Sequence, residues 1–275
     1  MKFIFCLTIL SFILQAPTEA AVFCDRSKNS LSVLQELGDE LKYQLIDGRV
    51  YASGNDNSLF NSIGKIKCGD IAGTAFFLGP CAIVTNHHFL RECKKDGKEN
   101  EMQFEYKHNG SSFQKKMMPL TVAASGNSSE IKTKESINDP DWLVLKPPQC
   151  EDQTFPTLTL CPASGDKEEI SGAQLVGLAY DRDDSKGLSL DRNCKIYLGT
   201  GNFKNFGHDC SARAKTSGAP LFKRIGQKNC LLAIHAGCYS NGEKCETGIT
   251  KKFYEDTTFN FAIPAELLRS VLPGR

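Results

Sequence analysis

The strongest pattern in the sequence is GTAFFLGPCAIVTNHHF at residues 73–89. Two short runs of β-forming residues, Gly73–Leu78 and Ala82–Thr85, are separated by the Gly79-Pro80 turn signal. The second run leads directly into the histidine pair His87-His88. We therefore expect two strands here, the second of which delivers a histidine pair to its end.

Further strands are expected from about residue 60 onward. Met102, Phe104 and Tyr106 alternate with polar residues, and Asn109-Gly110 is a strong hairpin turn after which Phe113 resumes the strand pattern. The other short strand-like runs are Trp142–Leu145, Gln174–Ala179, Lys195–Leu198, Pro220–Phe222 and Cys230–Ile234. Strand-rich segments with short glycine-containing turns and no interleaved helices predict an all-β sandwich or barrel.

Helical patterns are expected only at the two ends. Four leucines recur at intervals of three and four within residues 30–46, which predicts a helix with one apolar face: Leu34, Leu37, Leu41 and Leu45. This helix precedes every strand, so we expect a pro-segment or a packing arm over residues 21–46. A second helix is predicted over Ala265–Leu272 at the C-terminal end.

The first twenty residues have the features of a secretory signal peptide. Lys2 supplies a positive charge, Phe3–Leu14 is almost wholly apolar, and Thr18-Glu19-Ala20 is a small-residue cleavage site. The apolar run is too short for a membrane span, although a retained membrane anchor is the alternative interpretation. We expect a secreted protein, extracellular or periplasmic, with no membrane attachment after cleavage.

The cysteines support export. Cys6 lies in the signal segment, so 11 of the 12 cysteines belong to the mature chain. Scattered cysteines in an exported chain predict disulfides, and an odd number leaves at least one free or bonded to another chain. The pairing does not follow from the sequence. No Cys-x-x-Cys pair is present, which argues against structural zinc, and we expect no metal and no cofactor.

Charge excludes some classes of partner. The net charge is +1 and no block of like charge occurs, which argues against nucleic-acid binding and against attachment to an anionic membrane. The oligomeric state does not follow from the sequence.

Three short segments hold the residue types of a nucleophilic active site. The first ends at the histidine pair, the second is NDPDWLVL at residues 138–145, and the third is KTSGAPLF at residues 215–222. A serine hydroxyl becomes a nucleophile when a histidine removes its proton, and a buried carboxylate holds that imidazole in the correct tautomer. Each segment alone is weak evidence. Their order of His, Asp and Ser in a strand-rich chain is stronger evidence.

These segments resemble those of trypsin-fold serine peptidases, most closely the V8-like glutamyl endopeptidases. The stretch TNHHF at residues 85–89 is similar to the T-[AN]-x-H-x motif, which selects His88 over His87 as the base. DWLVL at residues 141–145 is similar to D-x-A-L-L, which selects Asp141 over Asp139. TSGAPL at residues 216–221 resembles [DN]-S-G-[GS]-P-[LV], with Ser217 as the nucleophile.

The resemblance extends over residues 47–272. DGRV at residues 47–50, followed by IGKI at 63–66, is similar to the opening of the V8-like domain. LAIHAG at residues 232–237 is similar to the G-I-H-x-G strand of that domain. FN with IP within residues 259–264 is similar to its end. It implies two packed six-stranded β-barrels of chymotrypsin type, at about residues 60–155 and 160–260. A C-terminal helix and the N-terminal helical extension flank these barrels.

Two residues beside the nucleophile depart from the family pattern. The resemblance implies an oxyanion hole formed by the N–H groups of Lys215 and Ser217, but the family has glycine where this chain has Lys215. A side chain there could tilt the peptide and remove one donor. Trypsin has an aspartate where this chain has Thr216, so we expect no buried ion pair between that position and a new N-terminus.

The resemblance also implies a substrate pocket formed by Ser211, Ala212 and His235. His235 matches the position that receives an acidic P1 side chain in glutamyl endopeptidases, or it is a core histidine on a buried strand. Ser211 matches the pocket floor and is uncharged, which argues against a preference for Lys or Arg. We assign no role to His208, His108 or His87, for which surface or structural placement is expected.

The sequence therefore predicts a secreted serine endopeptidase whose partner is a protein or peptide substrate. The first alternative is a catalytically impaired homologue that binds a protein partner through the same cleft. The second is an unrelated disulfide-rich adhesin, in which the order of the three segments would be a coincidence.

Overall fold

The computed structural model describes residues 50–52, 58–107, 115–126, 138–150, 157–161, 169–178, 188–198, 204–213, 215–240, 243–244 and 258–272. The chain divides into two compact units, Met1–Tyr51 and Ala52–Arg275. Strand β1 (Val50–Ala52) lies at their boundary, and all other described elements belong to the second unit. The predicted signal segment, the helix over residues 30–46 and the Asn109-Gly110 turn lie outside the described residues.

The first barrel is an antiparallel sheet with the strand order β6-β5-β2-β3-β4-β8-β7. Its strands are β2 (Ile63–Cys68), β3 (Ile71–Phe77), β4 (Ile83–Thr85), β5 (Gln103–Lys107), β6 (Lys115–Pro119), β7 (Thr121–Ser125) and β8 (Leu143–Lys146). Only Leu120 separates β6 from β7, and Pro119 ends β6 because proline has no N–H for a ladder. Counted as one bent strand, these two halves close a six-stranded ring between β5 and β8.

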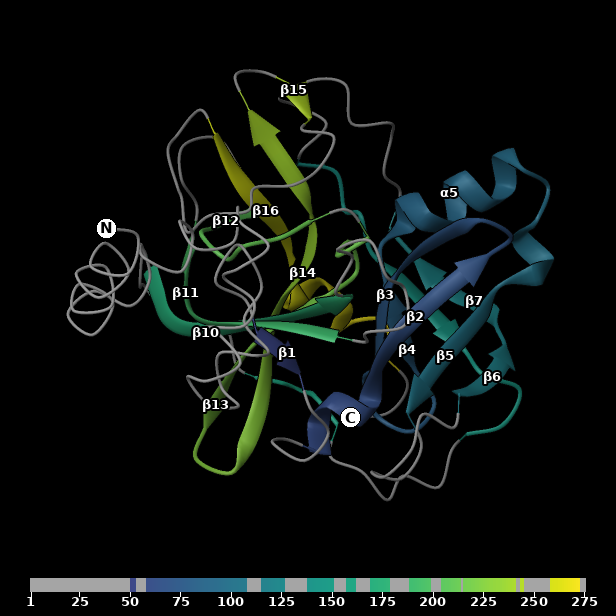
Figure 1. Ribbon diagram of the computed structural model, residues 1–275, viewed down its shortest axis with the longest axis horizontal. Coiled ribbons are helices and arrows are strands. Elements are labelled where there is room, and N and C mark those ends of the chain that lie inside the picture. The colour runs from purple at the N-terminus through teal and green to yellow at the C-terminus, as the bar shows by residue number, and fades with distance from the viewer. Residues whose placement is uncertain are drawn as a thin grey trace, which may run out of the picture. The chain divides into compact units, whose positions relative to one another are not determined.

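The second barrel follows the order β11-β10-β13-β14-β16-β12, and β12 pairs back to β11. These six strands are β10 (Glu169–Leu178), β11 (Leu188–Tyr197), β12 (Phe206–His208), β13 (Pro220–Ile225), β14 (Lys228–Ser240) and β16 (Thr258–Pro264). Two short strands, β9 (Thr159–Leu160) and β15 (Glu243–Lys244), pair with β14. The prediction of an all-β fold with two six-stranded barrels is confirmed, and the barrels form separate groups of strands in Figure 1.

Each barrel has its own apolar core because alternate strand residues point inward. In the first barrel Phe77, Phe104 and Tyr106 are in mutual ring contact, with centroids 5.0–5.4 Å apart. In the second barrel the fully buried residues include Leu221, Ala233 and Ala262 on neighbouring strands.

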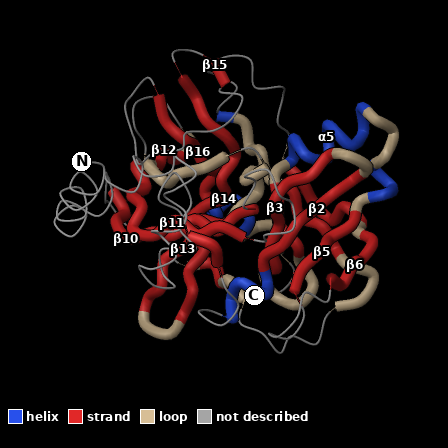
Figure 2. Tube along the Cα trace, viewed as in Figure 1, coloured by secondary structure: helices blue, strands red, loops and turns tan. Residues whose placement is uncertain are grey.

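The helical elements differ from the sequence prediction. Only Asn86 separates β4 from helix α5 (His87–Lys95), although no helix was expected between strands. Figure 2 shows α5 as a helix among the strands of the first barrel. Its buried residues Phe89, Leu90 and Cys93 form a stripe at helical spacing on the first barrel. The expected helix over Ala265–Leu272 is only a 3-10 helix at Ala265–Leu268 followed by a turn. Two further 3-10 helices lie at Ser58–Ser62 and Glu99–Glu101.

Four disulfides link described residues. They join Cys68 to Cys93, Cys81 to Cys150, Cys161 to Cys230, and Cys194 to Cys210. Cys238 is also disulfide-bonded, whereas Cys24 and Cys245 lie outside the described residues. The four bridges fit a protein that folds outside a reducing cytosol. Within the described part of the chain, no helix is long and apolar enough to cross a membrane.

Candidate active site

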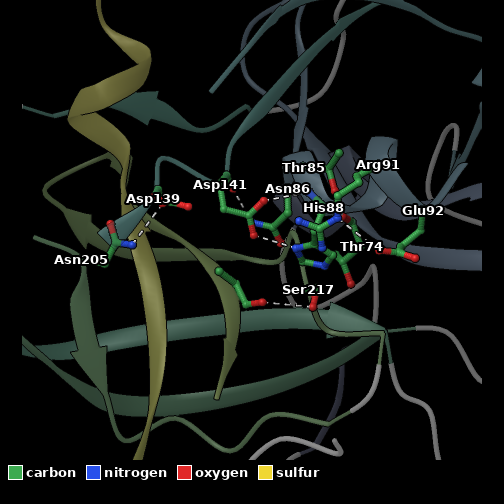
Figure 3. A network of polar contacts seen from close by, with 11 residues as sticks. Thr74, Thr85, Asn86, His88, Arg91, Glu92, Asp139, Asp141, Asn205 and Ser217 are labelled. Carbon is green, nitrogen blue, oxygen red and sulfur yellow. Dashed lines mark hydrogen bonds and ion pairs between the residues drawn. The ribbon is translucent and has the colours of Figure 1, made fainter. Parts of the chain in front are cut away.

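The candidate site draws its residues from both barrels (Figure 3). His88 is the second residue of α5, and Asp141 lies two residues before β8 in the first barrel. Ser217 belongs to the turn that leads into β13 of the second barrel. The backbone N–H of Thr74 on β3 donates to the carbonyl of Ser217 at 2.9 Å, so a backbone hydrogen bond joins this turn to the first barrel.

His88 and Asp141 form a tight pair. Oδ2 of Asp141 lies 2.6 Å from Nδ1 of His88, and the backbone N–H of His88 donates to Oδ1 at 2.7 Å. The Asp141 side chain is almost completely buried, and the side-chain amide of Asn86 donates to the Asp141 carbonyl at 2.9 Å. Because both carboxylate oxygens face His88, the carboxylate favours a proton on Nδ1 and leaves Nε2 as the basic nitrogen.

The hydrogen-bonded pair consists of His88 and Asp141 and not of their neighbours His87 and Asp139. The carbonyl of Asp139 accepts a hydrogen bond of 3.5 Å from the side chain of Asn205 (Figure 3). Burial is the largest influence on His87 and lowers its pKa below 6.5, against a weaker opposing effect of Asp141. The structure therefore brings His88, and not His87, into the carboxylate pair.

Ser217 lies beside His88 but its hydroxyl is oriented toward another acceptor. Oγ of Ser217 donates to the backbone carbonyl of Ala236 at 3.4 Å. Both residues are described, and Ser217 Oγ forms no hydrogen bond with the His88 ring. A β-bulge in β14 leaves the Ala236 carbonyl available as an acceptor. The pairing of β14 with β16 skips from His235 to Gly237, so Ala236 has no partner residue in this ladder.

The turn around the serine has an unusual backbone. Lys215 has φ +66°, and among the described residues it is the only non-glycine with a positive φ. This is the left-handed conformation that glycine adopts easily and a lysine rarely does. Lys215 thus has the type of backbone conformation for which the family pattern uses glycine. Gly218 has φ +87°, and a Cβ atom there would lie 2.0 Å from the carbonyl oxygen of Thr74.

Thr216 stabilises the same turn through local hydrogen bonds. Its N–H donates to the carbonyl of Arg213 at 3.1 Å, and its Oγ1 accepts the N–H of Arg213 at 3.2 Å. The side chain is buried. The neutral Thr216 side chain therefore stabilises this loop through hydrogen bonds, without the negative charge that an aspartate would carry at this position.

The predicted pocket residues are all buried. Ser211 and Ala212 follow β12, and the N–H of Ser211 donates to Oδ2 of Asp191 on β11 at 2.7 Å. His235 lies on β14, and its Nδ1 is 3.0 Å from Nε2 of His208. Burial, and to a smaller extent His235, holds the pKa of His208 well below 6.5. Among the described residues, Nδ1 of His208 has no hydrogen-bond partner.

Comparison with known proteins places the chain in a family. Residues 73–232, more than half of the chain, match the family model described as a trypsin-like peptidase domain. The chain belongs to this family. One solved structure that matches this chain is the inactive form of a serine-to-alanine mutant of Rv3671c from M. tuberculosis H37Rv. It has 15% identity and a TM-score of 0.46, and the alignment covers 78% of this chain and 86% of that chain. A comparison with curated proteins found no match.

Sequence reasoning missed two buried polar residues of this trypsin-like peptidase domain. Asp191 lies in β11, which mixes polar and apolar residues, so its position in the sequence did not mark it as buried. His208 likewise has no signal in the sequence, because its burial depends on β16 and β11, which flank β12, and on His235 from β14. Among the described residues, no group of three or more His, Cys, Asp or Glu side chains could hold a metal ion.

Proposed function

We propose that this protein is a secreted serine endopeptidase that cleaves protein substrates through an acyl-enzyme intermediate. His88 acts as the base, Asp141 orients it, and Ser217 is the nucleophile. The observation that carries the proposal is the buried carboxylate of Asp141, which contacts both the ring and the backbone N–H of His88 beside Ser217. The family of the chain supports the same reaction class.

In the proposed reaction the Ser217 side chain first turns from the Ala236 carbonyl toward Nε2 of His88. His88 then removes the hydroxyl proton while Oγ attacks the substrate carbonyl. The N–H groups of Lys215 and Ser217 stabilise the negative oxygen of the tetrahedral intermediate. His88 gives its proton to the leaving amine, and a water molecule hydrolyses the acyl-enzyme by the same route.

Two electrostatic features bear on the substrate pocket that we propose for Ser211, Ala212 and His235. An imidazole N–H on His235 can donate to an acidic P1 side chain, which supports a preference like that of the V8-like branch. Asp191 instead holds a carboxylate behind Ser211. We propose the acidic preference, and a panel of P1 substrates tests it. Strong cleavage after Arg or Lys would refute it and would implicate Asp191.

One observation favours a second candidate function. The Ser217 hydroxyl hydrogen-bonds to Ala236 instead of His88, as expected for a homologue that has lost catalysis and binds a protein partner through its cleft. If the protein has this second function, it would bind a partner without cleaving it.

Labelling with a fluorophosphonate probe distinguishes the two candidates. We expect the wild type to be labelled, Ser217→Ala to lose labelling, and Ser171→Ala to keep it. Ser171 is a matched control because it is an exposed serine on β10 that bonds Glu169. A folded wild type that shows no labelling would refute the endopeptidase and support the binding function.

We also propose the chain organisation expected from the sequence. Residues 1–20 are a signal peptide, residues 21–46 an extension, and residues 47–272 the peptidase domain. N-terminal sequencing of the exported protein tests the first boundary, with a start at Ala21 expected.

A further inference from the structure

Thr74 connects the first barrel to both ends of the nucleophile turn. It is a completely buried residue on β3. Its N–H donates to the carbonyl of Ser217 at 2.9 Å, and its Oγ1 donates to the carbonyl of Lys215 at 3.0 Å. The carbonyl of Thr74 accepts a hydrogen bond of 2.8 Å from Oγ1 of Thr85 on β4, which fixes Thr74 within its own barrel.

Lys215 is the residue in this turn that needs support. Its φ of +66° is unfavourable for any residue with a Cβ atom. Such a conformation persists only where surrounding contacts over-determine it. The hydroxyl of Thr74 makes one such contact, because it holds the Lys215 carbonyl and so limits rotation of the residue. Holding the carbonyl therefore also limits how far the N–H of Lys215 can turn.

The nucleophile turn packs tightly against the backbone around Thr74. A Cβ atom on Gly218 would lie 2.0 Å from the Thr74 carbonyl oxygen and 2.3 Å from Oγ1 of Thr85. A Cβ atom on Gly73 would lie 3.2 Å from the Ser217 carbonyl oxygen. The backbone of Gly73 therefore also runs close to the turn. The two hydrogen bonds of Thr74 thus act across a tight backbone contact.

We propose that Thr74 is a positioning residue for the oxyanion hole. Its hydroxyl keeps Lys215 in the left-handed conformation, so that the Lys215 N–H faces the substrate oxygen. This inference rests on the proposed function and extends it to a residue 141 positions before Lys215. A glycine adopts this conformation without help. The Thr74 hydroxyl should therefore matter much more when residue 215 is lysine than when it is glycine.

A double-mutant cycle tests this coupling. The proteins are the wild type, Thr74→Val, Thr74→Ser, Lys215→Gly and the Thr74→Val/Lys215→Gly double variant. Valine has a similar shape but no hydroxyl, and it keeps the backbone hydrogen bond to Ser217. Steady-state hydrolysis of a peptide substrate gives kcat and KM separately, and urea unfolding of the same proteins gives a readout that does not require catalysis.

We expect Thr74→Val to lower kcat by about 100-fold, the effect of losing one oxyanion donor, with little change in KM. Thr74→Ser should keep most of the activity because it keeps the hydroxyl. In the Lys215→Gly background the loss caused by Thr74→Val should shrink to a few-fold. For unfolding, Thr74→Val removes the hydrogen bond to the residue 215 carbonyl in both backgrounds. Lysine without this support can relax from its strained conformation, whereas glycine has no such strain to relieve, so the shift in the equilibrium constant should be about fivefold smaller with lysine than with glycine at residue 215.

Equal losses of kcat in both backgrounds, or a Thr74→Ser variant as impaired as Thr74→Val, would overturn the inference. The two proposals fail separately. A wild type without hydrolytic activity would refute the endopeptidase, and the unfolding cycle would then decide about Thr74. Additive shifts in unfolding would overturn the positioning role, and coupled shifts would support it.

Discussion

Protonation of His208 should make the stability of this protein depend on pH. His208 lies on β12, is completely buried, and contacts a second buried histidine, His235, at 3.0 Å. A charged imidazole in this site would lack water and would face His235. Burial therefore lowers the pKa of His208 well below its ordinary value of 6.5.

The sign and size of the effect follow from linkage. A histidine whose pKa is depressed in the folded protein binds its proton more readily after unfolding, so stability is present above pH 6.5 and is lost as the pH falls below it. Each pH unit well below 6.5 removes about 1.4 kcal/mol while the folded form stays neutral. Between pH 7 and pH 5 this amounts to about 2 kcal/mol at most.

Urea unfolding at pH 7 and pH 5 measures this loss. Trp142 is the only tryptophan in the sequence and is buried beside the candidate site, so its fluorescence reports unfolding. We expect His208→Gln to lose up to about 2 kcal/mol less than the wild type between the two pH values. A glutamine amide can still hydrogen-bond to His235.

His87→Gln is the matched control. His87 is only half-buried, and Asp141 partly offsets the effect of burial on its pKa. Its substitution should therefore change the pH dependence of unfolding less than His208→Gln does. If the wild type and His208→Gln lose the same free energy of unfolding between pH 7 and pH 5, the reasoning from burial is wrong.

Three further predictions concern the turn, the triad and a disulfide. Gly218→Ala should destabilise by more than about 3 kcal/mol and reduce activity, because the new Cβ would overlap the backbone. Gly79→Ala, with φ +80° but nothing within 4 Å, should cost only about 1 kcal/mol of unfolding free energy. Asp141→Asn should keep substrate binding but lower kcat by about 10⁴-fold in steady-state assays, as in the serine-protease template. Removing the Cys161–Cys230 bridge, which spans 69 positions, should cost about 4 kcal/mol in denaturant unfolding.

The strands were predictable because alternation is a local property. Met102, Phe104 and Tyr106 alternate in the sequence, and the structure has strand β5 over Gln103–Lys107 there. Helix α5 was missed because His87-His88-Phe89 continues a strand-like run, and its apolar stripe at Phe89, Leu90 and Cys93 is short. The Cys68–Cys93 bridge, which joins α5 to β2, depends on the folded arrangement and could not be deduced from spacing.

The site was predictable only in part. The histidine pair, the acid and the serine turn were found from their residue types and order, and the structure brings His88 and Asp141 into contact. The orientation of the Ser217 hydroxyl was not predictable, because the acceptor at Ala236 exists only through the bulge in β14. The buried polar residues Asp191 and His208 were missed because strands distant in the sequence bury them.

Lys215 illustrates why a departure from a motif cannot be judged from the motif alone. Read locally, a lysine in place of glycine predicts a tilted peptide and a lost oxyanion donor. In the folded protein the same lysine has a positive φ, and the hydroxyl that contacts its carbonyl belongs to Thr74 in the other barrel. A conformation that glycine achieves through its own freedom is here supported by a long-range contact. The consequence of the substitution therefore depends jointly on residues 74 and 215, and neither single variant alone can reveal it.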